Sequence, residues 1–125
     1  MNIPKELLYT EDHEWVKKLD NGNVWIGITE YAQDAMGEIV FAELPGIGDR
    51  LEKGATLCTV ESVKAVSDVS SPVVGTIENV NEELEDTPEL INQSPYDAWL
   101  VELADVELGE LLTPEQYEGI LEKGE

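Results

Sequence analysis

The sequence predicts an all-β sandwich or barrel with short peripheral helices and one helix at the C-terminus. Two observations carry this prediction. Most apolar segments are short and are bounded by Gly, Pro, Asn or Asp turn residues, and long segments of helical periodicity do not alternate with them. The chain has 125 residues, 42% of them hydrophobic, which suits a single compact domain over residues 1–125 with a modest core.

Turn residues mark the expected strands in chain order. Asp20-Asn21-Gly22 separates two apolar segments and predicts a hairpin between them. In the segment WLVEL, alternation along a strand would place Trp99, Val101 and Leu103 on one face. The expected strands cover residues 14–19, 23–28, 38–44, 55–62, 73–80 and 99–103.

Two helices carry recognisable capping residues. Thr29 can N-cap a short helix over residues 30–36, and Gly37 suits the position after it. Near the C-terminus, Thr113 is followed by a proline at the first helical position and by Gln116, which completes a capping box. The predicted C-terminal helix therefore covers about residues 113–122.

Charge and residue counts exclude several classes of function. Seven Lys and Arg against 28 Asp and Glu give a net charge of −21, which excludes binding to nucleic acid or to an anionic membrane and favours basic partner surfaces. Cys58 and His13 are each the only residue of their type, so neither a disulfide nor a zinc site is expected. Without a nucleophile-elbow or nucleotide-binding motif, no catalytic residue is expected. Lacking a signal peptide and a membrane-spanning run, the chain is expected to be cytoplasmic, and we expect a monomer.

Lys64 stands out among so few basic residues. It lies in VESVKAVSD (60–68), between two expected strands, with Ser and Asp residues on both sides that favour a turn. An ordinary surface lysine is the simplest interpretation. The functional alternative is a long amine-bearing side chain, presented at a hairpin tip for attachment of a swinging group.

The surrounding pattern resembles the biotinyl and lipoyl attachment domains over residues 46–80. Glycine turns precede the strand that carries Glu61 and Lys64, and Gly75 follows eleven residues after the lysine. Biotinyl domains flank their lysine with methionines, whereas Val63 and Ala65 stand here, which favours lipoate. The resemblance implies a flattened β-barrel with the modified lysine on a hairpin.

Nearly the whole chain resembles the H proteins of the glycine cleavage system. The matching stretches are HEWV (13–16), GITEYAQDAMGEIVFAELP (27–45), VESVKAVSD (60–68), SPVVG (71–75), NEELEDTPELINQSPY (81–96) and LLTPEQY (111–117). H proteins commonly place Gly before the Trp that follows SPY, where this chain has Ala98 in a shorter loop. The resemblance therefore does not extend to the shape of that loop.

The resemblance implies a non-catalytic carrier with lipoate attached to Lys64. Its implied partners are glycine decarboxylase, which loads an aminomethyl group, aminomethyltransferase, which unloads it, dihydrolipoyl dehydrogenase, and a lipoate ligase or lipoyltransferase. Glu61 and Gly75 occupy positions associated with recognition by the lipoylating enzyme. The positions of Glu14 and Asp68, with Asp12 assisting, match a cleft that receives the aminomethyl-bearing arm.

Two other functions remain open from the sequence. A lipoyl-relay protein would pass lipoate to 2-oxoacid dehydrogenases, and transfer assays with both sets of partners would separate it from the carrier. An acidic β-sandwich binding module would leave Lys64 unmodified. The intact mass of protein from a lipoate-replete host separates that module from both lipoylated alternatives.

Overall fold

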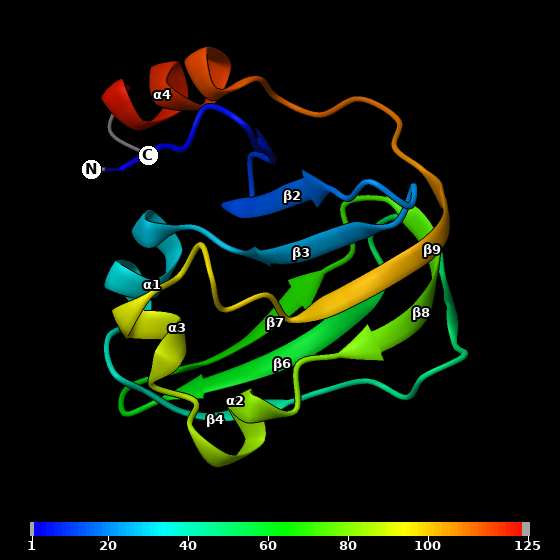
Figure 1. Ribbon diagram of the computed structural model, residues 1–125. Helices are drawn as coiled ribbons and strands as arrows, with labels where there is room; N and C mark the ends of the chain where they lie inside the picture. Colours follow the sequence, from blue (N-terminus) through cyan, green and yellow to red (C-terminus); the bar gives the residue numbers. More distant parts are fainter. Residues whose placement is uncertain (1, 124–125) are drawn as a thin grey trace.

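The computed structural model describes residues 2–123, and its strands form two antiparallel sheets (Figure 1). The six-stranded sheet has the order β1-β2-β3-β9-β8-β5, and the three-stranded sheet has the order β4-β6-β7. The strands are β1 (Leu8–Tyr9), β2 (Glu14–Lys18), β3 (Val24–Ile28), β4 (Ile39–Glu43), β5 (Arg50–Leu51), β6 (Thr56–Ser62), β7 (Val66–Ser70), β8 (Val74–Val80) and β9 (Val101–Glu107). The strand-dominated fold class is confirmed.

Local turn and cap chemistry forms the elements that the sequence predicted. The β2–β3 hairpin closes with the Leu19 N–H donating to the Asn23 carbonyl over 2.8 Å, and Gly22 takes a φ of 89°. The helices are α1 (Glu30–Met36), α2 (Glu83–Asp86), α3 (Leu90–Gln93) and α4 (Pro114–Glu122). Both members of the predicted capping box are present at Thr113 and Gln116. Within the described residues, no helix is long and apolar enough to cross a membrane.

The main core takes side chains from both sheets. Ile26 and Leu103 of the six-stranded sheet and Val60 of the three-stranded sheet are each completely buried. Cys58 belongs to the same cluster, and burial raises the pKa of its thiol to about 12. A thiol in that environment stays protonated and acts as a small apolar residue.

The prediction that Trp99 shares a face with Val101 and Leu103 is wrong. Strand β9 begins only at Val101, after the Leu100 N–H has bonded to the Ile26 carbonyl. Trp99 therefore leaves the core face and stacks on Trp25, with ring centroids 5.0 Å apart and planes at 4°. The aromatic contact outweighs the alternation that a longer strand would impose.

A second core cluster attaches α4 to the N-terminal strands. Tyr9 and Tyr117 stack with centroids 4.7 Å apart, and Tyr9 exchanges backbone hydrogen bonds with Leu112. Trp15 lies in the same cluster above Gly27, where an added Cβ would come within 2.5 Å of the indole. Figure 1 shows α4 lying over the N-terminal segment, so the two ends of the chain complete one part of the molecule.

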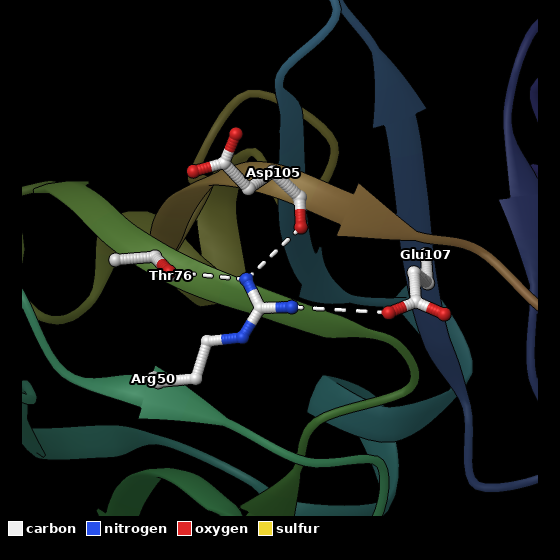
Figure 2. Close-up of polar contacts among 4 residues, drawn as sticks. All are labelled: Arg50, Thr76, Asp105 and Glu107. Carbon is white, nitrogen blue, oxygen red and sulfur yellow. Dashed lines mark hydrogen bonds and ion pairs between the residues drawn. The ribbon is translucent and has the colours of Figure 1, made fainter.

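Arg50 joins the last strands of the six-stranded sheet (Figure 2). Its Nη1 donates to Thr76 Oγ1 over 3.1 Å and to the Asp105 carbonyl over 3.0 Å. Its Nη2 lies 3.9 Å from Glu107 Oε2, and both of these side chains are exposed. A guanidinium with several fixed donors suits this bridging position across β5, β8 and β9.

Candidate functional site

Lys64 lies in the tight turn between β6 and β7, as the sequence predicted. The Ser62 N–H donates to the Ala65 carbonyl over 2.8 Å. The Ser62 hydroxyl accepts from the backbone N–H groups of Lys64 and Ala65, over 3.3 and 3.1 Å. Ser62 is buried whereas Lys64 is exposed, so a closed network of short-range bonds presents the lysine at the surface.

The turn also rests against the end of α1. The Val63 N–H donates to the Glu38 carbonyl over 3.0 Å. The Lys64 side chain crosses Gly37, where an added Cβ would lie 3.2 Å from Lys64 Cε. Gly37 has a φ of 83°, so this helix end favours glycine for its backbone conformation as well as for the space it leaves to the lysine.

Glu14 is a buried carboxyl on the opposite sheet. Only 3% of the residue is exposed, and Thr10 Oγ1 donates to its Oε1 over 3.1 Å. The pKa of Glu14 is raised to about 7, chiefly by burial and also by the nearby negative charge of Asp12, against the opposing hydrogen bonds from Thr10 and the Ser70 backbone. The carboxyl thus changes charge near neutral pH.

A pocket of about 400 Å³ lies between Glu14, α1 and β7. Strand β7 is an edge strand of the three-stranded sheet, and its residues Ser67–Ser70 form one wall. The remaining lining residues are Asp12, His13, Glu14, Ile28, Tyr31, Ala32, Ala35 and Met36. Strand β7 begins at Val66, two residues after Lys64, and leads along the pocket, so Asp68 lies about 7 Å of extended strand beyond Val66.

The pocket brings together all three acids that the sequence analysis placed in a cleft, in different environments. Asp12 and Asp68 are exposed, whereas Glu14 is buried. Asp68 Oδ1 accepts a hydrogen bond from Thr59 Oγ1 over 2.9 Å, on the neighbouring strand. The Asp68 carboxylate therefore already accepts a hydrogen bond within the protein. Of the three acids, Glu14 is the one whose charge is least stabilised by water.

Glu61 and Gly75 do not lie together. Glu61 is exposed on β6, three residues before Lys64. Gly75 is buried in β8 of the other sheet, at a register shift between Val74 and Thr76. A Cβ added to it would lie 3.0 Å from Leu103 Cβ, so the close approach of β9 accounts for glycine at this position.

His13, Tyr31 and Tyr117 are parts of the pocket region that sequence reasoning missed. His13 has a φ of 69°, and its ring lies 4.4 Å from that of Tyr31. The Tyr117 hydroxyl lies 2.8 Å from His13 Nδ1 and 2.8 Å from Thr29 Oγ1. The polar run before β2 signals a turn, but no local signal connects it with a tyrosine 104 residues later.

Across residues 2–123, no group of three His, Cys, Asp or Glu side chains is placed to hold a metal ion. The geometry offers an exposed primary amine on a hydrogen-bonded turn, and an acidic pocket along the strand that follows the turn. This arrangement suits a covalently attached group whose far end reaches the pocket.

Comparison with known proteins gives consistent results from sequence and structure. A family model described as "Glycine cleavage H-protein" matches residues 7–124. The glycine cleavage system H protein of Listeria monocytogenes serotype 4a is 52% identical, over 98% of this chain and 100% of the relative. The probable H protein of Thermococcus gammatolerans is 49% identical, over 96% and 92%. The crystal structure of a glycine cleavage system H protein from Mycobacterium marinum matches with a TM-score of 0.88 and 39% identity, over 98% and 100% of the two chains.

Proposed function

The chain belongs to the glycine cleavage H-protein family, a carrier component of the glycine cleavage system, and we propose that it carries lipoate as an amide on Lys64. The observation that supports this most is the exposed Lys64 on its hydrogen-bonded turn. Attachment requires a primary amine that an enzyme can reach and a backbone of fixed conformation that presents it. The turn provides both. When bound, lipoate supplies the reactive dithiolane, while the protein supplies presentation and shelter.

Attachment is an acyl transfer to the lysine nitrogen. Lys64 Nζ, as the neutral amine, forms a bond to the lipoyl carboxyl carbon of an acyl-adenylate donor. The bond from that carbon to the adenylate phosphate breaks, AMP leaves, and the nitrogen gives up one proton to solvent. A lipoate ligase or lipoyltransferase performs this step in the proposal, and Glu61 contributes to its recognition of the hairpin.

The pocket beside β7 is the proposed shelter for the cargo. An aminomethyl group carries a protonated amine near neutral pH, and burying a cation is costly unless an anion and hydrogen-bond acceptors receive it. Glu14 provides a desolvated carboxyl whose pKa is raised to about 7. A cation beside it favours the ionised form. Asp12 and Asp68 add negative charge at the exposed side of the pocket.

The partners in this proposal are the other components of the glycine cleavage system. Glycine decarboxylase loads the arm, aminomethyltransferase unloads it, and dihydrolipoyl dehydrogenase restores the disulfide. The protein itself is a non-catalytic carrier that each enzyme uses in turn. Its cytoplasmic location and monomeric state stay predictions from the sequence.

Intact-mass measurement of protein from a lipoate-replete host tests the attachment site. Wild type should gain one lipoyl increment, and Lys64→Arg should gain none, because the guanidinium keeps the charge but removes the primary amine. The variant should keep the fold, since changes at exposed positions usually cost less than about 0.5 kcal/mol. Lipoylation that persists in Lys64→Arg would place the attachment elsewhere, and an unmodified wild type would refute the carrier chemistry.

A further inference from the structure

Exposed hydrophobic side chains gather at the Lys64 turn. Five large hydrophobic residues within the described part of the chain are exposed, and four of them are near this turn: Val40 at 45%, Phe41 at 49%, Val63 at 66% and Val66 at 66%. The fifth, Ile47, lies beyond the opposite end of β4. We call the four residues the tip patch. Clustered rather than scattered apolar exposure marks an interaction surface.

Strand register places the patch on the outer face of the three-stranded sheet. Phe41 pairs with Glu61, and Glu61 pairs with Val66, so these three side chains form one row across β4, β6 and β7. Val40 lies at the irregularity between Ile39 and Phe41, which leaves it exposed beside the row. Apolar side chains therefore flank Glu61 on both sides.

The patch is held in place by the same contacts that hold the lysine. Val63 bonds through its N–H to the Glu38 carbonyl, and the Ser62 hydroxyl receives the two N–H groups that follow Val63. Strand pairing fixes the positions of Phe41 and Val66. Because this surface is already ordered, a partner that binds here loses little free energy to ordering side chains and loops of this chain.

We propose that the tip patch is the docking surface for the enzyme that acylates Lys64, and that this enzyme presents an apolar socket with a basic rim. The proposal rests on the proposed function. Before acylation, Lys64 Nζ extends only about 6 Å from its Cα at standard bond lengths. An enzyme that reaches this nitrogen must contact Val63 and its neighbours, whereas an enzyme that works at the far end of a loaded arm can dock farther away.

Charge specifies the rim of the socket. Glu61 lies within the row, and Glu43 is exposed in the next row along β4. The whole chain carries a net charge of −21. Arg and Lys around an apolar socket would complement this surface and speed the encounter, whereas an acidic rim would repel it.

The test compares acylation of unmodified protein by a purified lipoate ligase with lipoate, ATP and magnesium. The double variant Phe41→Thr/Val66→Thr removes apolar surface and places a β-branched residue, which suits a strand, at both positions. Ile47→Thr is the control, because it removes exposed apolar surface away from the turn. We expect at least a tenfold fall in kcat/KM for the double variant, or about 1.4 kcal/mol, and less than a twofold change for the control. Adding salt should raise KM for wild type.

The outcomes separate this proposal from the carrier function. If wild type accepts no lipoate at Lys64, the proposed function fails. If wild type and the double variant are acylated equally well, the carrier stands and the docking surface is refuted. The same holds if acylation is unchanged and only glycine decarboxylation slows, because the patch then serves another partner. Val63→Thr, in the turn itself, provides a second test should the double variant have a lowered melting temperature.

Discussion

The raised pKa of Glu14 can be detected in the pH dependence of the free energy of unfolding. Its pKa is raised to about 7 in the folded protein, from an ordinary value of 4.5. The folded state therefore holds this proton more tightly than the unfolded state does. The resulting stabilisation is complete below the unfolded pKa and is lost as pH rises through the folded pKa.

The magnitude follows from the two pKa values. Between about pH 5 and about pH 8, titration of Glu14 should lower the free energy of unfolding by about 2–3 kcal/mol. The variant Glu14→Gln carries a neutral amide of similar shape and lacks this titration. The stability of wild type relative to the variant should therefore fall by about that amount across the range.

Urea unfolding at a series of pH values provides the assay. Using the difference between two proteins removes most of the contribution from the other acids, which both share. Glu11→Gln removes a carboxyl from an exposed neighbour in the same turn and serves as the control for the loss of one acid. Parallel stability curves for wild type and Glu14→Gln would show that the Glu14 carboxyl titrates as an exposed acid does, and would refute the reasoning.

Three further predictions address other residues. Gly75→Ala should lower the free energy of unfolding by about 1–3 kcal/mol in urea, because its Cβ would meet β9 at 3.0 Å, whereas Gly119→Ala, with open space around it, should not destabilise. Glu61→Ala should slow lipoylation without changing the melting temperature, and an unchanged rate would leave Glu61 as ordinary surface charge. In loaded protein without aminomethyltransferase, Glu14→Gln should speed ammonia release more than Asp68→Asn, since charge-assisted hydrogen bonds contribute about 1.5–3 kcal/mol each. Equal release from all three proteins would mean that these acids do not shelter the cargo.

Structure that depends on nearby residues could be predicted from the sequence. The caps at Thr29 and Thr113 bond to groups three residues away, and Gly22 and Gly37 adopt the positive φ that their positions suggested. Strand β9 was harder to place, because its start depends on a stacking partner 74 positions earlier at Trp25. The two-residue strands β1 and β5 are too short to give a periodic pattern.

At the site, too, the features that depend on nearby residues could be predicted, whereas those that depend on distant residues could not. The exposure of Lys64 follows from Ser62, whose hydroxyl forms the turn through local bonds. Nothing in the sequence distinguishes Glu14 from 27 other acids, because its burial arises in the folded chain, where the Ser70 backbone and Thr10 lie against its carboxyl. The grouping of Glu14 with Asp68 was available only through family resemblance, and the tip patch requires the register of three strands.

The contacts at the Lys64 turn and at the pocket differ in how far apart their residues lie in the sequence. This difference affects the order in which the two parts can fold during synthesis. The Lys64 turn closes through bonds that span two or three residues. His13, which lines the pocket, contacts Tyr117 across 104 residues, and Tyr117 also contacts Thr29 across 88 residues. Long-range contacts must overcome a larger loop-closure entropy, and domains emerge from the ribosome N-terminus first. The acceptor turn can therefore order while the C-terminal helix is still inside the ribosome, but the contacts of Tyr117 with His13 and Thr29 cannot form until that helix has emerged.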